Sequence, residues 1–288
     1  MAASPSITLR LFRYDPEADA VPRYEDHTVP RTPHMRVLDV LNHVYDKADV
    51  PVAHRWYCGT KKCGECALTV NGTPMLSCWE AAEDGMTCEP LANFPILRDL
   101  AVDTAPAEAR IVAMQPFLTR TVRPAFPEAL DPRAMEASNH LAKCIECHLC
   151  SAAVPARVAA EGPALPGGAG PAGLVRFARF ALDPREEADR KTLAAQAGLD
   201  AVPAEPALSR LCPQNIDIVR EAIEPVRTRL FGKSVGAAES APASTVFVKA
   251  RAWSAFVRLA DADKQALASS GALQPLDVPG IREAFRAP

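Results

Sequence analysis

The sequence predicts an α+β protein of two domains, and three observations lead to that prediction. Strand-type and helix-type patterns alternate within the first hundred residues. From about residue 108 onward the patterns are helical and are separated by breaks rich in proline and glycine. A length of 288 residues is enough for two domains. We therefore expect domains at residues 1–107 and 108–231, followed by a linker and a helical tail at 232–288.

The first domain begins with a strand at residues 7–12 (ITLRLF), where apolar and polar side chains alternate. Residues 35–44 (MRVLDVLNHV) place apolar side chains at helical spacing. Residues 66–78 contain two strand-like runs that are joined by Asn71-Gly72, the strongest short signal for a β-hairpin. A strand, a helix, a cysteine loop and a hairpin in this order predict a small α+β domain.

The second domain is expected to be helical. Its main break is the stretch GPALPGGAGPAG at residues 162–173, and residues 232–245 have the composition of a flexible linker. The predicted helices cover residues 135–150, 173–182, 185–198 and 215–230, with further amphipathic helix at 246–273.

Composition and charge exclude several classes of protein. A net charge of −3 predicts no nucleic-acid partner. No run of about 18 apolar residues occurs, and the N-terminal residues lack the pattern of a secretory signal. We therefore expect a cytoplasmic protein, either free or peripheral on the inner face of the membrane. Thiols stay reduced in that compartment, so the nine cysteines are expected to be metal ligands rather than disulfides.

The first group of cysteines lies at residues 58–78, in the stretch CGTKKCGECALTVNGTPMLSC. Its C-x4-C-x2-C spacing with a fourth cysteine downstream is typical of a plant-type 2Fe–2S cluster. Such a loop must point amide groups at the sulfurs, and its two glycines permit positive φ and close backbone approach. The predicted ligands of the 2Fe–2S cluster are Cys58, Cys63, Cys66 and Cys78.

The second group lies in the stretch LAKCIECHLCSAAVP at residues 141–155. It follows the ferredoxin run C-x2-C-x2-C-x3-C-P, except that Val154 stands where the fourth cysteine would be. Ferredoxin clusters take their last ligand from a remote Cys-Pro, and this chain has one at Cys212-Pro213. The predicted ligands of a 4Fe–4S cluster are Cys144, Cys147, Cys150 and Cys212.

With both groups in view, the chain resembles the iron–sulfur subunit of succinate dehydrogenase and fumarate reductase. The resemblance covers about residues 6–230 and runs through both cysteine groups. It includes the stretches ITLRLFRYDPEAD, EPLANFPILRDLAVD (89–103), MQPFLTR (114–120), FALDPREEADR (180–190) and LCP (211–213). The resemblance implies an N-terminal β-grasp 2Fe–2S ferredoxin domain followed by an α-helical ferredoxin domain.

The resemblance also implies a third cluster, 3Fe–4S, but this chain lacks the cysteines that would bind it. The family's three ligand positions fall at Val154, Val202 and Leu208, all of them aliphatic. We therefore expect that no 3Fe–4S cluster is bound and that packing fills its place. Of the remaining residues, Cys88 is expected to be a buried structural thiol, and His148 to be no ligand.

Other side chains surround the first group of cysteines. Arg55, Lys61 and Lys62 are expected to form a solvated basic edge of the loop; the alternative is that they stabilise a reduced cluster. We expect the rings of Trp56, Tyr57 and Trp79 to shield the cluster from water.

The resemblance implies electron transfer between a partner flavoprotein that contains FAD and a second redox partner. This second partner, which accepts or donates the electrons, is expected to be a membrane anchor or another redox protein. The chain lacks a Rossmann glycine fingerprint and a catalytic triad pattern, so we expect no catalytic residues in it and the dicarboxylate site on the flavoprotein. Two alternatives remain open: the 2Fe–2S subunit of a molybdenum hydroxylase, and a regulatory or interaction module that carries a cluster.

Overall fold

The computed structural model describes residues 6–49, 51–121, 124, 126–154, 170–202 and 204–232. The chain divides into two compact units, with the change from the first to the second between Asp103 and Thr104. The linker and tail expected after Gly232, and most of the break at 162–173, lie outside the described residues.

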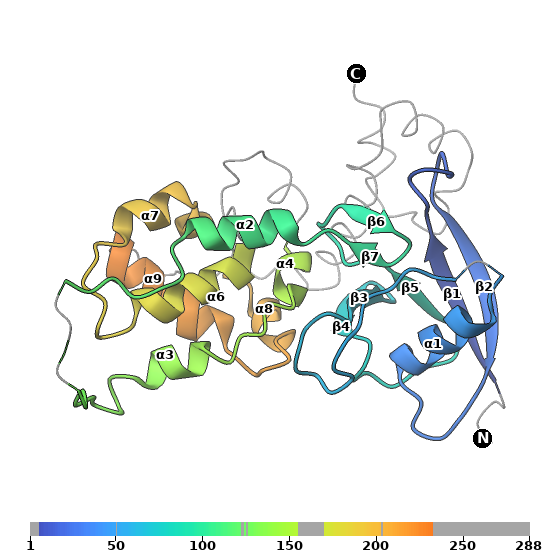
Figure 1. The fold of residues 1–288 in the computed structure, drawn as a ribbon, viewed down its shortest axis with the longest axis horizontal. Helices are drawn as coiled ribbons and strands as arrows, with labels where there is room; N and C mark the ends of the chain where they lie inside the picture. The colour runs from blue at the N-terminus through green and yellow to red at the C-terminus, as the bar shows by residue number, and fades with distance from the viewer. Residues whose placement is uncertain are drawn as a thin grey trace. The chain divides into compact units, whose positions relative to one another are not determined.

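The first unit is built on a five-stranded mixed sheet with the order β2-β1-β5-β3-β4 (Figure 1). β1 pairs with β2 in antiparallel fashion and with β5 in parallel fashion, while β3 is antiparallel to both β4 and β5. The strands are β1 (Ser6–Arg13), β2 (Arg23–Pro30), β3 (Ala67–Val70), β4 (Thr73–Leu76) and β5 (Met86–Glu89), and a separate hairpin is formed by β6 (Ile96–Arg98) and β7 (Ala101–Val102).

The helix α1 (Val37–Lys47) lies beside β1 and β2 and provides much of this unit's core (Figure 1). It begins where Asp39 Oδ2 accepts a hydrogen bond from the backbone N–H of Arg36, at 2.8 Å, which satisfies a donor at the helix start. Its apolar face packs with the buried face of β1. The shared core contains Ile7, Leu9, Leu11, Val37, Val40, Leu41 and Val44.

The hairpin predicted at residues 66–78 is present. β3 and β4 pair from Ala67↔Leu76 to Val70↔Thr73, so that Asn71-Gly72 forms a two-residue connection. Asn71 has φ 48° and Gly72 has φ 81°, as a type I′ turn requires at both positions. The predicted strand and helix at the start of the chain are confirmed as β1 and α1, and the α+β fold class is confirmed.

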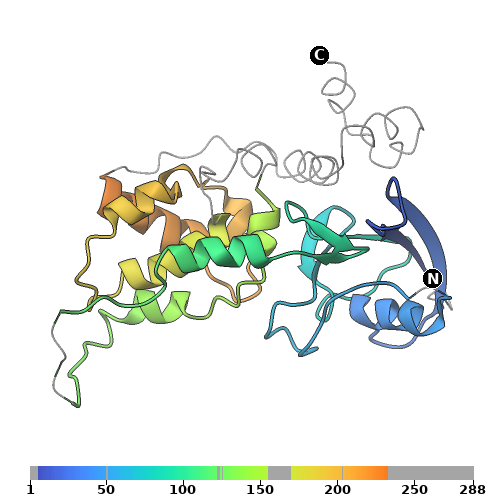
Figure 2. The same ribbon diagram turned by 45° about the horizontal axis from the view of Figure 1, so that its top comes forward.

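The second unit is helical, with α6 (Gly170–Ala181) at its centre. α6 contacts α2 (Ala105–Ala113), α3 (Glu136–Leu141) and α4 (Leu149–Ala152), and it runs between α2 and α3 in both views (Figures 1 and 2). The remaining elements are α7 (Lys191–Gln196), η1 (Leu199–Ala201), α8 (Pro206–Arg210) and a continuous helix made of η2 (Ile218–Ile223), α9 (Glu224–Val226) and η3 (Arg227–Phe231). Turns of the wider π type form η2 and η3.

Two predicted helices are shorter in the structure than expected. The helix predicted at 135–150 ends at Leu141, and the chain continues without helix to His148. The helix predicted at 185–198 is reduced to α7. Before α7, side chains bind the nearby backbone: Asp183 Oδ1 accepts from the N–H of Arg185 at 2.9 Å. Such local hydrogen bonds compete with helix formation.

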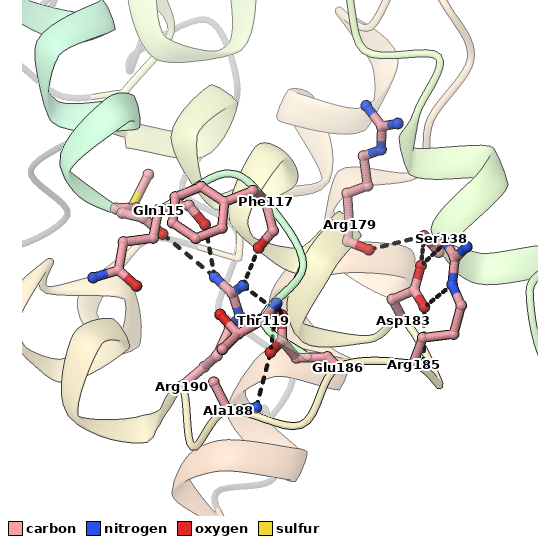
Figure 3. A network of polar contacts seen from close by, with 11 residues as sticks. Gln115, Phe117, Thr119, Ser138, Arg179, Asp183, Arg185, Glu186, Ala188 and Arg190 are labelled. Carbon is pink, nitrogen blue, oxygen red and sulfur yellow. Dashed lines mark hydrogen bonds and ion pairs between the residues drawn. The ribbon is translucent and has the colours of Figure 1, made fainter. Parts of the chain in front are cut away.

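A buried ion pair fixes the segment that follows α2 (Figure 3). Arg190 and Glu186 are each 3% exposed and form an ion pair. Arg190 also donates through Nη1 to the carbonyl oxygen of Gln115 at 2.9 Å, and through Nη2 to that of Phe117. These bonds satisfy carbonyl groups after the helix end, which have no partner within the helix.

No helix among the described residues combines the length and the apolar character that a membrane crossing requires.

Candidate functional site

The first cysteine loop directs backbone amides at one thiol. Cys58 Sγ accepts hydrogen bonds from the N–H groups of Thr60 at 3.4 Å, Lys62 at 3.3 Å and Cys63 at 3.3 Å. Gly59 has φ 66°, a conformation that costs a residue without Cβ little. The loop therefore has the convergent donors that a thiolate needs.

These donors change the acidity of Cys58. The N–H groups of Thr60 and Lys62 lower the pKa of the Cys58 thiol to about 6, with a further contribution from Cys63. The hydrogen bonds thus favour the thiolate form of Cys58, which is the form that binds metal.

Cys66 and Cys78 form a second pair at the base of the β3–β4 hairpin. Both are buried, and Ser77 donates its N–H to the carbonyl oxygen of Cys66 at 3.1 Å. Burial raises the pKa of the Cys66 thiol to about 12, and the neighbouring Cys78 thiol also raises it, whereas the N–H of Cys78 lowers it. The four cysteines are thus arranged as two contacting pairs, Cys58 with Cys63 and Cys66 with Cys78.

The second group of cysteines lies in the helical unit, where the structure brings Cys212 near the other three. Burial raises the pKa of Cys144 to about 11 and that of Cys147 to about 12, and it also raises the pKa of Cys150 well above its usual value. For all three, a negative charge on Cys212 raises the pKa as well. The thiols of Cys144, Cys147, Cys150 and Cys212 are thus close enough for a charge on one to act on the others, and a cation or a cationic cluster core would stabilise their thiolate forms.

Backbone amides also point at this second group. Glu146 donates its N–H to Cys144, Leu149 donates to Cys147, and Ile216 donates to Cys212 Sγ at 3.4 Å. Glu146 has φ 53° and His148 has φ 60°, so both lie in the left-handed region. This backbone conformation ends the expected helix and turns the amides toward the sulfurs.

Among the residues that the structure describes, no three His, Cys, Asp or Glu side chains converge closely enough to bind a single metal ion. Contacting pairs of thiols are instead the arrangement that a 2Fe–2S cluster requires, because two irons share four cysteines. In a 4Fe–4S cluster each thiolate binds a different iron, so its four sulfurs are separated further than around one ion. Each group thus contains the four thiols that one such cluster needs.

The three aliphatic residues are buried as expected. Val154 is 6% exposed, and Val202 and Leu208 are each 1% exposed. His148 is also buried, and burial lowers its pKa to about 4. Cys88, in β5, belongs to the core of the first unit, and burial raises its pKa to about 12. Its position agrees with that of a structural thiol.

The aromatic residues near the first loop lie on the surface. Trp56 is 50% exposed, Trp79 is 47% exposed and Tyr57 is 81% exposed. Tyr57 is thus the most exposed of the three rings, and the shielding of the cluster by these rings stays a prediction. Trp79 forms cation–π contacts with Lys61 and Arg36, with the charged groups 5.2 and 5.8 Å from the ring centroid.

Two charged residues beside the second group were not singled out from the sequence. Glu146 lies between Cys144 and Cys147, and its Oε1 is 3.2 Å from Nη1 of Arg176 in α6. The sequence signal for Glu146 was its place within the cysteine run. No sequence pattern indicated Arg176, because its proximity to Glu146 depends on how α6 packs.

The chain is similar to known iron-sulfur proteins. A family model described as a 2Fe-2S iron-sulfur cluster binding domain matches residues 8–109. The fumarate reductase iron-sulfur subunit of Mycobacterium tuberculosis is 33% identical over 221 residues, which cover 73% of this chain and 87% of that protein. The corresponding subunit of Haemophilus influenzae is 30% identical over 236 residues, which cover 75% of this chain and 90% of that protein.

Other curated relatives are longer than this chain. An iron-sulfur protein of Methanocaldococcus jannaschii is 33% identical over 227 residues, which cover 79% of this chain and 44% of that protein. The chain thus spans less than half the length of some of the curated relatives it matches.

Among solved structures, a chain of the Mycobacterium smegmatis Sdh1 complex in the apo form has a TM-score of 0.71 and 27% sequence identity. The match covers 80% of this chain and 97% of that one.

Proposed function

The chain belongs to the family of fumarate reductase iron–sulfur subunits, and from this premise we propose that it transfers electrons within a succinate dehydrogenase/fumarate reductase-type complex. The observation that carries the proposal is the presence of two separate groups of four cysteines, one in each compact unit. Two such groups allow an electron to enter through one unit and leave through the other.

In this proposal Cys58 and Cys63 bind one iron of a 2Fe–2S cluster, and Cys66 and Cys78 bind the other. The contacts within each pair support this division. The thiols of Cys144, Cys147, Cys150 and Cys212 would hold a 4Fe–4S cluster, and their mutual electrostatic influence supports it. When bound, the clusters supply the one-electron states that protein side chains lack.

We propose that a 3Fe–4S cluster is absent. Val154, Val202 and Leu208 carry no metal-binding atom, and their burial supports a role in packing. Burying each of these side chains contributes on the order of 1.5–3 kcal/mol. The chain would then pass electrons through two clusters rather than three.

The partner that exchanges electrons with the first group would be a flavoprotein carrying FAD, and the dicarboxylate would bind there. Exposed rings around the first cysteine loop support a docking role for this surface, because Trp and Tyr are enriched in protein interfaces. Neither a molybdenum hydroxylase subunit nor a regulatory module is favoured, because the likeness to fumarate reductase subunits covers 73% of this chain and so extends well beyond the 2Fe–2S domain at residues 8–109.

Stepwise reduction followed by electron paramagnetic resonance (EPR) tests the proposal on the full chain isolated with the proteins that co-purify with it. We expect a rhombic signal of a reduced 2Fe–2S cluster, a second signal of a reduced 4Fe–4S cluster at lower potential or lower temperature, and a flavin in the partner. A preparation that contains only 2Fe–2S signals, together with a molybdenum cofactor in the partner, would contradict it.

A further inference from the structure

Arg176 extends from α6 to the backbone loop between Cys144 and Cys147. Its Nη1 lies 3.2 Å from Oε1 of Glu146, and the two side chains are 29% and 31% exposed. The guanidinium carbon also lies 5.8 Å from the ring centroid of Phe180. The side chain is therefore held from two sides, rather than extending freely into solvent.

Arg176 holds the side chain of Glu146, whose backbone N–H faces the sulfur of Cys144. Glu146 adopts φ 53°, which few residues other than glycine and asparagine adopt readily. In this conformation its N–H donates a hydrogen bond to Cys144. An ion pair that fixes the Glu146 side chain therefore also favours the backbone geometry that aims this N–H at the sulfur.

Arg176 acts on the thiol through its charge as well. The positive charge of Arg176 lies close enough to Cys144 to act on its sulfur, as do the negative charges of Cys212 and Glu146. The Nε of Arg176 is buried and has no hydrogen-bond acceptor within the described part of the chain. A buried donor of this kind is costly unless an acceptor is supplied, and an anionic cluster would supply one.

We propose that Arg176 is a positioning and charge-tuning residue of the second cysteine group, which makes one-electron reduction of the cluster held there more favourable. This inference rests on the proposed function, because it requires a 4Fe–4S cluster at Cys144, Cys147, Cys150 and Cys212. Reduction adds one negative charge to the cluster. A fixed positive charge nearby in a partly buried site stabilises that extra charge, and the hydrogen bond from Glu146 to Cys144 does the same.

The test is an EPR-monitored redox titration of both clusters in the full chain. Arg176→Met removes the charge and the ion pair while keeping an unbranched side chain of similar length. We expect it to make reduction of the second cluster about tenfold less favourable, a fall of about 59 mV for a one-electron couple. The first cluster is the internal reference, and its potential is expected to stay unchanged.

Arg179→Met is the matched control. Arg179 lies one turn further along the same helix, and its guanidinium contacts the ring of Phe180, with the guanidinium carbon 5.1 Å from the centroid. The substitution removes the same charge from α6 without touching Glu146. A shift of equal size in both variants would overturn the proposal, because a long-range charge effect would then explain it.

Glu146→Gln tests the same contact from the other side. It keeps the backbone N–H but removes both the ion pair and a negative charge near Cys144, and we expect the loss of that charge to outweigh the loss of the ion pair, so that reduction of the second cluster becomes more favourable. This variant decides the matter if Arg176→Met fails to assemble the cluster: an unchanged or lower potential in Glu146→Gln overturns the proposal. Absence of a 4Fe–4S signal in the unsubstituted protein would instead contradict the proposed function itself.

Discussion

Asp99 accepts a hydrogen bond from Nε of Arg13 at 3.0 Å, and both side chains are 3% exposed. The same carboxylate accepts the backbone N–H of Tyr14 at 3.0 Å and that of Ala53 at 2.8 Å. Asp99 therefore connects the end of β1, the β6–β7 turn and the segment that leads into the cysteine loop at Cys58.

Replacing Asp99 by Ala is expected to lower the free energy of unfolding by about 3–5 kcal/mol, because the buried Arg13 charge loses its buried partner and keeps only the more exposed Glu25. Chemical denaturation of the full chain measures this change. The control is Asp26→Ala, which removes the same charge from an exposed pair: Asp26 lies 3.9 Å from Arg10, and the two side chains are 84% and 46% exposed. That variant should change stability by less than about 0.5 kcal/mol. Equal effects in both variants would contradict the role of Asp99.

Asp183 gives the stability of the second unit a pH dependence. Its carboxylate accepts from Nε and Nη2 of Arg185 at 2.8 and 2.7 Å, and from Ser138 Oγ at 3.1 Å (Figure 3). Burial raises the pKa of Asp183, but the hydrogen bonds and charge of Arg185 outweigh burial, and the folded-state pKa lies below 3.8. The stabilisation is therefore complete above pH 3.8 and is lost as the pH falls through the folded-state pKa.

Asp183→Asn should accordingly be less stable than the unsubstituted protein at pH 7, by about 3 kcal/mol. The difference in free energy of unfolding between the two proteins should become smaller as the pH falls below 3.8, the pKa of this carboxyl group in the unfolded chain. Denaturation curves of both proteins at a series of pH values measure it. If the difference in free energy of unfolding stays constant down to the lowest pH at which both proteins fold, the charge of Asp183 does not contribute to that difference.

Cys63→Ser tests the separation of the two cysteine groups. Loss of one thiolate of the first group should weaken or abolish the rhombic signal of the reduced 2Fe–2S cluster, while the 4Fe–4S signal remains, because the second group lies in the other compact unit. EPR of the reduced protein detects both. Cys88→Ala is the control and should retain both signals, since Cys88 lies in the core of the first unit. Loss of both clusters in Cys63→Ser would argue against two independent sites.

Local sequence patterns predicted the fold best. The alternation in residues 7–12 and the turn residues Asn71-Gly72 are local signals, and the structure confirms the strand and the hairpin that they predict. The helix predicted at 135–150 failed beyond Leu141 because Glu146 and His148 take left-handed backbone conformations, which helical periodicity does not reveal.

The candidate site, like the fold, could be predicted only where its signals are local in the sequence. Spacing along the chain predicted seven of the eight proposed ligands, and the eighth, Cys212, was predicted from its Cys-Pro pair. The contact between Arg176 and Glu146 depends on the packing of α6, a segment distant in sequence, and no local pattern marks it. Exposure of Tyr57 was likewise not predictable from its position beside Cys58.

We propose that this chain binds one 2Fe–2S and one 4Fe–4S cluster, and no third cluster at Val154, Val202 and Leu208. The most direct measurement is the ratio of iron to protein, together with the EPR spectrum of the air-oxidised full chain. We expect about six irons per chain and no stoichiometric near-isotropic signal of a 3Fe–4S cluster. About nine irons per chain, or a 3Fe–4S signal at one spin per chain, would contradict it.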